Sequence, residues 1–205
     1  MYQERLQGSI PISRKGVAML PDGSNLDNLK AILALCQLPN HTGRSGIYHE
    51  FEESDARVRI DQQEGETIAF FCIDEQSKKR NDTCGKCGLR DKLWGTQPGQ
   101  TICDLLVYYE RKTNEKIERR ALCFVELKTH ASDLGHGTDQ VINTYQAIKD
   151  RFTIPGNCVV QAFLIAYHGS PTDEHAAYQN KLEKRFRHGN FLFNAKNDRF
   201  PDLIQ

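Results

Sequence analysis

The stretch RRALCFVELKTH (residues 119–130) is the centre of the fold that this chain is expected to adopt. Its middle is a run of apolar residues of the kind found in a strand buried on both faces. Glu126 and Lys128 interrupt that run, and side chains two positions apart on a strand lie on the same face. The sequence therefore predicts an acid and a base side by side on a strand that otherwise suits the core.

The neighbouring segments predict how this strand is paired. TICDLLVYYE (101–110) is a second apolar strand, and the polar stretch RKTNEKIE (111–118) predicts a turn that pairs the two strands antiparallel. Such a pairing brings Asp104 close to residues 124–130. The remaining pattern predicts strands at 68–74, 158–169 and 189–197, and helices at 25–38, 138–152 and 173–187. A hairpin followed by strands joined through helices predicts an α/β protein, with a mixed sheet flanked by helices.

Chain length and net charge limit the possible domain organisation and binding partners. A chain of 205 residues is expected to form one domain, residues 1–205, with an insertion at 76–100 that is rich in Lys, Asn and Gly around a pair of cysteines. The 27 basic and 27 acidic residues cancel, which argues against a polybasic membrane anchor but not against a local basic patch. With no membrane-length apolar stretch and no signal-peptide core, we expect an intracellular, cytoplasmic protein that does not bind membranes.

Two carboxylates beside one lysine make a costly arrangement unless a further positive charge compensates them. Mg²⁺ supplies such a charge, because it takes oxygen ligands and uses one or two carboxylates together with a substrate phosphate. The alternative is a structural ion pair, in which Glu126 and Lys128 face water on an edge strand and Asp104 is a polar residue near a turn. The apolar surroundings and the following helix favour the metal site.

Asp104, with Glu126-Leu127-Lys128 on the next strand and a helix after it, resembles the PD-(D/E)xK nuclease superfamily. Cys103 stands where the motif usually has proline. The resemblance covers roughly residues 68–170 and implies a restriction-endonuclease-like fold. It also implies Mg²⁺- or Mn²⁺-dependent hydrolysis of phosphodiester bonds in DNA, with RNA not excluded. On this resemblance Asp104 and Glu126 hold the metal, the Leu127 carbonyl completes its ligands, and Lys128 positions the attacking water.

The same resemblance implies two further site residues. Members often carry a polar residue on the helix after the lysine, which indicates Gln140, with Gln146 as the alternative. They often add a metal-binding glutamate from an upstream helix, for which Glu50 and Glu53 are both candidates. Such an enzyme is expected to act as a defence or repair endonuclease, as a homodimer or within a larger nuclease complex. The alternative is a nucleic-acid-binding or assembly subunit on the same fold, inactive alone or activated by a partner.

The cysteines suggest a second metal. Cys84 and Cys87 form a CxxC whose glycines permit a tight turn around one ion, and zinc in structural sites takes four ligands. Cys72 and Cys103 flank the loop, so these four cysteines are the predicted structural Zn²⁺ ligands. His41 or His49 in place of one cysteine, an iron–sulfur cluster, and a pair of loop thiols are the alternatives. A zinc deaminase is not indicated, because its HxE and PCxxC patterns are missing.

Basic side chains near this loop are candidate contacts for nucleic-acid phosphates, which Lys and Arg neutralise. They are Lys78, Lys79, Arg80, Lys86 and Arg90. His130 and His136 follow the ExK motif, and for each we consider either a phosphate contact or a solvated loop position.

Overall fold

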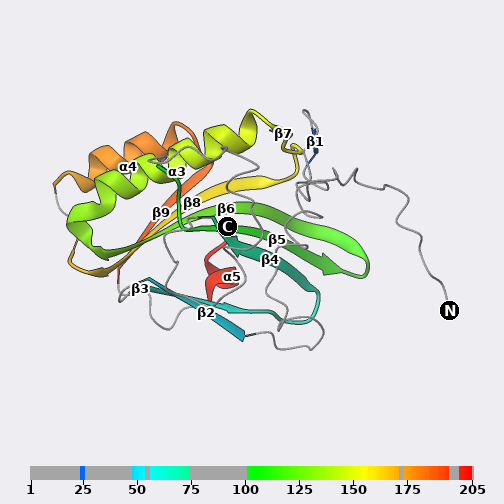
Figure 1. The fold of residues 1–205 in the computed structure, drawn as a ribbon. Coiled ribbons are helices and arrows are strands. Elements are labelled where there is room, and N and C mark those ends of the chain that lie inside the picture. Colours follow the sequence, from blue (N-terminus) through cyan, green and yellow to red (C-terminus); the bar gives the residue numbers. More distant parts are fainter. Residues whose placement is uncertain are drawn as a thin grey trace, which may run out of the picture.

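The centre of the computed structural model is a mixed five-stranded sheet in the order β4–β5–β6–β8–β9 (Figure 1). The structure describes residues 24–25, 48–53, 56–73, 101–170, 173–193 and 199–204. The strands of the sheet are β4 (Glu66–Cys72), β5 (Leu105–Thr113), β6 (Lys116–His130), β8 (Val159–His168) and β9 (His188–Phe193). β4, β5 and β6 run antiparallel to one another, whereas β6, β8 and β9 are parallel. The predicted α/β class is confirmed.

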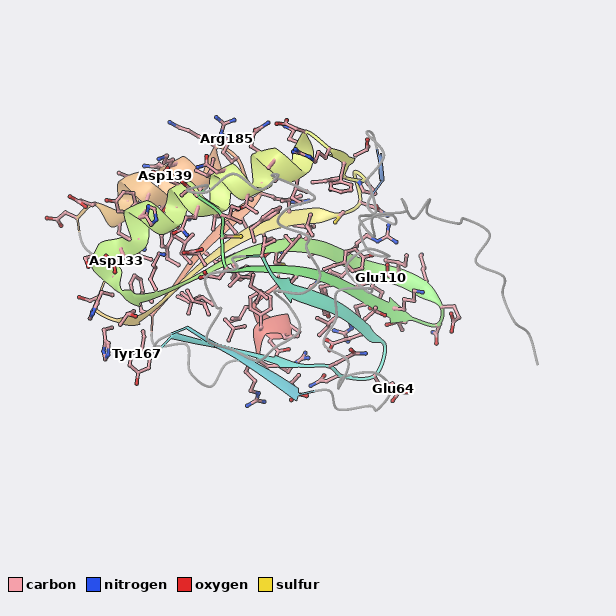
Figure 2. The ribbon with its side chains drawn as sticks, viewed as in Figure 1. Glu64, Glu110, Asp133, Asp139, Tyr167 and Arg185 are labelled. Carbon is pink, nitrogen blue, oxygen red and sulfur yellow. The ribbon has the colours of Figure 1, made fainter. Side chains whose placement is uncertain are left out.

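Helices cover one face of this sheet. The 3₁₀ turn η4 (Ala131–Asp133) leads from β6 into α3 (Leu134–Lys149), and α4 (His175–Glu183) connects β8 to β9. Figure 1 shows α3 and α4 side by side above the sheet. In Figure 2 the labelled Arg185 lies on the outer side of this helix layer, while Glu64 lies at the opposite side of the molecule. Among the described residues, no helix has the length and apolar character needed to cross a bilayer.

The other face of the sheet is covered by a hairpin and a short helix. β2 (Tyr48–Glu53) pairs antiparallel with β3 (Ala56–Asp61), and α5 (Phe200–Leu203) lies between this hairpin and the sheet (Figure 1). Val58, Phe200 and Ile204 pack against apolar side chains of the sheet. Two further strands, β1 (Ser24–Asn25) and β7 (Phe152–Thr153), form a separate parallel pair.

The turn between β5 and β6 sets the register of the two central strands. Asn114 and Glu115 both have positive φ angles, 50° and 62°, as a two-residue turn of type I′ requires. The register that follows pairs Leu105 with Val125. The hairpin predicted around residues 111–118 is therefore confirmed, and Asp104 lies just before β5 at the level of Glu126.

β6 is buried on both of its faces, which explains its long apolar run. On the helix-covered face Leu122 and Phe124 pack with Val141 and Ile148 of α3. On the opposite face Cys123, Val125 and Leu127 pack with Phe163 and Phe200, among others. Strand alternation then places Glu126 and Lys128 on the helix-covered face, beneath the first turns of α3.

Some predicted boundaries and elements are wrong. α3 begins at Leu134, not near residue 138, because the Thr138 hydroxyl donates to the Leu134 carbonyl from inside the helix and Asp133 occupies the N-cap position. The hairpin of β2 and β3 was not predicted, although Val58 and Ile60 alternate with charged residues. The helix predicted at 25–38 lies outside the described residues beyond Asn25, which belongs to β1.

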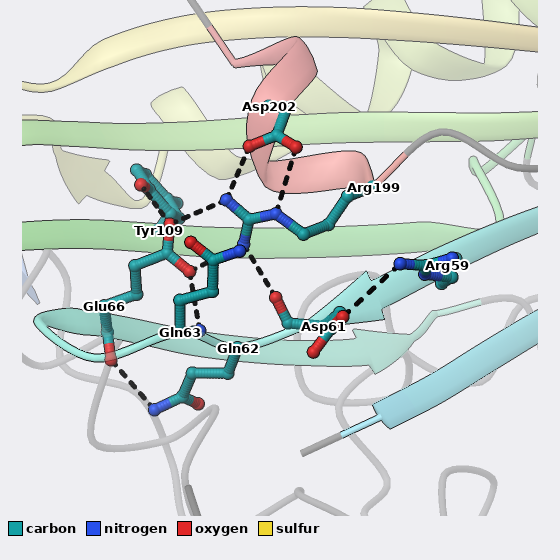
Figure 3. Close-up of polar contacts among 8 residues, drawn as sticks. All are labelled: Arg59, Asp61, Gln62, Gln63, Glu66, Tyr109, Arg199 and Asp202. Carbon is teal, nitrogen blue, oxygen red and sulfur yellow. Dashed lines mark hydrogen bonds and ion pairs between the residues drawn. The ribbon is translucent and has the colours of Figure 1, made fainter. Parts of the chain in front are cut away.

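Arg199 attaches α5 to the hairpin and the sheet (Figure 3). Its Nη1 donates to the Asp61 carbonyl (2.7 Å) and to Glu66 Oε2 (2.8 Å), and its Nη2 donates to Glu66 Oε1 (3.1 Å). Nε and Nη2 also bind the carboxylate of Asp202. The Tyr109 hydroxyl donates to Glu66 Oε1 at 2.9 Å. All five guanidinium N–H donors are therefore used: three hold α5 to Asp61 and Glu66, and two bond Asp202 within α5.

Candidate active site

Three elements meet at the candidate site. Asp104 immediately precedes β5, Glu126 and Lys128 lie on β6, and Gln140 lies in the second turn of α3. β6 delivers Glu126 and Lys128 to one face because they are two residues apart, and α3 covers that face as it leaves the strand. The structure thus brings together the four side chains named from the sequence.

The two carboxylates bridge the strands through backbone amides. The Asp104 N–H donates to Glu126 Oε2 at 3.0 Å, and the Leu127 N–H donates to Asp104 Oδ2 at 2.7 Å. The Glu126 carboxylate therefore binds the amide of Asp104, and the Asp104 carboxylate binds the amide of the residue that follows Glu126. This exchange fixes the two acids close together at the end of the β5–β6 ladder.

Lys128 connects the acids to the helix. Its ammonium group forms an ion pair with Glu126 Oε1 and donates to Gln140 Oε1 at 2.8 Å. The Glu126 side chain is 0% exposed and that of Lys128 is 17% exposed. A buried pair of this kind is held only with good geometry and further hydrogen bonds, which the amides and Gln140 supply here.

Gln140 and Thr144 hold the segment that carries Asp104. Gln140 Nε2 donates to the Ile102 carbonyl at 2.9 Å, and the Cys103 N–H donates to Thr144 Oγ1 at 2.8 Å. The Thr144 hydroxyl in turn donates to the Gln140 carbonyl. The sequence interpretation did not include Thr144, although its spacing of four residues from Gln140 places both on one helix face.

We expect Thr144→Val to lower the free energy of unfolding by about 1–3 kcal/mol, because the buried Cys103 N–H loses its acceptor. Urea denaturation measures the change. Thr138→Val is a matched control, since Thr138 is also buried and bonds a carbonyl of its own helix, but among the described residues no amide outside the helix donates to it. Equal losses in both variants would contradict a special role for Thr144.

Gly137 leaves room for the acid and the lysine beneath α3. A Cβ atom at this position would lie 3.1 Å from Glu126 Cγ and 3.3 Å from Lys128 Cε. Both distances are tighter than ordinary van der Waals contact. A side chain here would therefore displace the two charged groups, so the packing of the site favours glycine at position 137.

The donor set fits a hard divalent cation. Asp104 and Glu126 supply two carboxylates, which is what Mg²⁺ uses beside water and substrate phosphate. The Leu127 amide faces Asp104, and its carbonyl faces the same strand edge because a β-residue directs both groups to one side. In the described part of the chain, no three His, Cys, Asp or Glu side chains form a metal-binding group.

The predicted additional metal-binding glutamate falls on a different kind of element. Glu50 and Glu53 lie on strand β2, so the upstream helix expected for them is wrong. Their side chains are outside the described residues, as are the basic residues Lys78, Lys79, Arg80, Lys86 and Arg90. Ile73, the last described residue before that loop, lies beside the site, since its N–H donates to the Asp104 carbonyl at 2.9 Å.

The predicted zinc ligands are described only in part. Cys84, Cys87 and the side chain of Cys72 lie outside the described residues. Cys103 is fully buried among apolar residues, and its thiol donates to the Leu105 carbonyl. Burial, with a smaller contribution from the nearby charge of Glu126, raises the pKa of the Cys103 thiol well above its usual value. This environment is that of a core thiol, and the zinc site stays a prediction.

Cys123 and Cys158 are buried, as their apolar context predicted, and Cys36 lies outside the described residues.

No family model, curated protein or solved structure matches this chain.

Proposed function

We propose that this protein is a metal-dependent nuclease that hydrolyses phosphodiester bonds in DNA, with a fold of the restriction-endonuclease type. The observation that carries the proposal is the convergence of Asp104, Glu126, Lys128 and Gln140 at the end of the β5–β6 ladder. The order of strands and helix around them agrees with the PD-(D/E)xK pattern that the sequence resembles.

The chemistry follows from these side chains. Asp104, Glu126 and the Leu127 carbonyl would hold Mg²⁺ or Mn²⁺, which lowers the pKa of a bound water and offsets the charge that builds on the phosphate. Lys128 would hold the attacking water in line, with its ammonium oriented by Gln140. Gln140 and Thr144 would keep Asp104 at a fixed distance from Glu126 by holding residues 102 and 103.

The loop at 74–100 supports nucleic acid as the substrate. Ile73 precedes the loop and its N–H donates to the Asp104 carbonyl, and Thr101 follows the loop three residues before Asp104, so the loop begins and ends beside the site. Five of its residues are the Lys and Arg named above, and cations of this kind bind phosphates without sequence preference. We propose that they hold the backbone of the substrate.

One observation favours a second candidate function. Glu126 is fully buried and both of its oxygens accept hydrogen bonds, as in a cluster that serves only the fold. On that alternative the protein is a nucleic-acid-binding or assembly subunit with an inactive site. Metal binding and cleavage separate the two candidates.

The experiment that tests the nuclease proposal is a cleavage panel. Supercoiled plasmid, linear duplex, single-stranded DNA and RNA would be incubated with the chain in EDTA, Mg²⁺ or Mn²⁺. We expect DNA to be cut only with the metals. The Lys128→Met protein, purified in the same way, controls for contaminating nucleases. A chain that binds metal and DNA yet cuts nothing would favour the binding subunit.

Metal binding itself is expected to stabilise the fold. Mg²⁺ at about 100 times its Kd should raise the free energy of unfolding by about 2.7 kcal/mol. Asp104→Asn should remove this effect, because it deletes a ligand charge while an amide oxygen can still accept from the Leu127 N–H. Asp139→Asn, which changes an exposed carboxylate on α3, should keep it. Thermal denaturation with and without Mg²⁺ measures the difference, and equal stabilisation of both variants would place the metal elsewhere.

A further inference from the structure

Two exposed histidines lie next to each other where neighbouring parallel strands end. His130 is the last residue of β6 and His168 is the last residue of β8, and the register pairs them directly. Their rings stack with centroids 5.7 Å apart and planes inclined by 25°. Tyr167 directly precedes His168, and Asp133 is three residues after His130. Figure 2 places these two residues at the same end of the molecule.

This pair continues the row of site residues along β6. Glu126, Lys128 and His130 are every second residue of the strand, so they share the helix-covered face at steps of about 6.6 Å. His168 shares that face, because Leu164 and Ala166 of β8 pack in the helix-side core. Exposure rises along the row, from the buried Glu126 through Lys128 to the exposed histidine. The pair therefore stands where the row reaches solvent.

In the described part of the chain, neither ring makes a hydrogen bond or an ion pair, whereas Glu126, Lys128 and Gln140 bond one another. The ring of Tyr167 lies edge-on to His168, and the Asp133 carboxylate, three residues after His130 in the chain, accepts from the Ser132 hydroxyl. A neutral imidazole donates one N–H, so the stacked pair presents at least two donors.

Phosphate is the ligand that matches this arrangement. Two adjacent rings each offer at least one N–H donor, and the oxygens of a single anion can accept from both rings. Donors to a charged oxygen also make stronger hydrogen bonds than donors to a neutral one. Because a nucleic acid carries phosphates at regular intervals along its backbone, a strand bound at Lys128 would carry its next phosphate toward the pair.

We propose that His130 and His168 together bind the nucleic-acid phosphate that neighbours the one cleaved at Lys128. The inference rests on the proposed nuclease function for the identity of the substrate. It assigns the pair to positioning the substrate and not to chemistry. Loss of the pair should therefore weaken binding and leave the turnover of bound substrate unchanged.

The first test uses binding without cleavage. Imidazole resonances of the full chain would be followed by NMR in EDTA while a thymidine hexanucleotide is added, with His130→Ala and His168→Ala assigning the two signals. We expect both signals to move with the same dissociation constant. His188, which starts β9 at the other end of the parallel strands, should not move. Inorganic phosphate, added in a parallel titration, shows whether the anion alone suffices.

The second test uses kinetics on the DNA substrate that the chain cuts. The double variant His130→Ala/His168→Ala should raise KM about tenfold, as expected for hydrogen bonds to a charged group, with kcat within about twofold. His188→Ala should leave both constants unchanged. Circular dichroism confirms that each variant is folded.

The outcomes separate this inference from the nuclease proposal. Moving signals in a chain that cuts nothing would support the phosphate site and overturn the nuclease. A normal KM in the double variant and unmoved signals, in a chain that cuts DNA, would overturn the phosphate site alone. A fall in kcat with an unchanged KM would also overturn the inference, because it would assign the pair to the chemical step. Unmoved signals in a chain that cuts nothing would overturn both.

Discussion

On the proposed nuclease function, replacing Lys128 by methionine is expected to reduce DNA cleavage by about 10²–10⁴-fold, the range that a positioned acid–base group contributes. Methionine keeps most of the side-chain volume and removes the ammonium that contacts Glu126 and Gln140. Single-turnover cleavage in Mg²⁺ measures the rate of the chemical step. The binding of DNA should change far less, because the lysine is mostly buried and contributes little to the outer surface.

The same variant should also unfold more easily. Without Lys128 the buried Glu126 carboxylate loses the cation that pairs with it, and breaking a buried pair on one side costs about 3–5 kcal/mol. Mg²⁺ should restore part of this loss, because a metal bound at Glu126 replaces the missing charge. Urea denaturation at pH 7 with and without Mg²⁺ tests both statements.

Lys181→Met is the matched control for this prediction. Lys181 also pairs with an acid, Asp139, but its side chain is 51% exposed and that pair links two helix surfaces. Exposed pairs contribute about 0–1 kcal/mol, so Lys181→Met should leave stability and cleavage nearly unchanged. If Lys128→Met cut DNA at the rate of the wild type, the lysine would not be catalytic and the site would be wrongly assigned.

Arg199→Ala is expected to lower the free energy of unfolding by about 3–5 kcal/mol at pH 7. The side chains of Arg199 and Glu66 are 9% and 3% exposed, so the substitution leaves a buried carboxylate without its cation (Figure 3). It also frees the Asp61 carbonyl and detaches α5 from the hairpin and the sheet. The free energy of unfolding of Arg199→Lys should lie between those of the wild type and Arg199→Ala, because a lysine keeps the charge but not the bidentate geometry.

The pH dependence of this loss has a definite sign. Burial alone would raise the pKa of Glu66, but hydrogen bonds from Arg199, the Gln63 amide and Tyr109 outweigh burial and hold that pKa below its usual value of 4.5. In the wild type the carboxylate therefore stabilises the fold above about pH 4.5, and this contribution disappears as pH falls through the lowered pKa. In Arg199→Ala the effect of burial on the Glu66 pKa is no longer offset by Arg199. Protonation of Glu66 at low pH should therefore remove the cost of burying its negative charge in the variant.

We therefore expect the difference in stability between wild type and Arg199→Ala to be smaller at pH 4 than at pH 7. Urea denaturation at both values measures it. Asp202→Asn is the control, because Asp202 binds the same guanidinium from a position that is 64% exposed, and its loss should cost less than about 1 kcal/mol. A deficit in Arg199→Ala that stays constant with pH would show that contacts other than the Glu66 pair account for it.

The candidate site could be named from the sequence because its parts are local. Glu126 and Lys128 stand two apart in an apolar strand, and the period of a strand places them on one face. Asp104 opens the preceding strand, and a short polar turn predicts the register that brings it close. Gln140 follows from the helix after the lysine, through the resemblance. These inferences need only the chain between residues 101 and 140.

Other parts of the site depend on packing between elements and could not be read from the sequence. Thr144 is one threonine among several until α3 lies over residues 102 and 103, where its hydroxyl meets the Cys103 amide. Gly137 gains its steric role only because Glu126 and Lys128 lie beneath it. His130 was noticed for its sequence position, but its partner His168 became visible only in the pairing of β6 with β8.

The α/β class, the central hairpin and the row of acid and base on β6 could be predicted from the sequence, because each follows from residues close together in the chain. Which distant groups meet depends on the tertiary structure. Arg199 and Glu66 are 133 positions apart, and nothing in either segment identifies the other as its partner. Period and turn chemistry act over a few residues. The partners of buried charges are instead selected by how the sheet, the hairpin and α5 pack together.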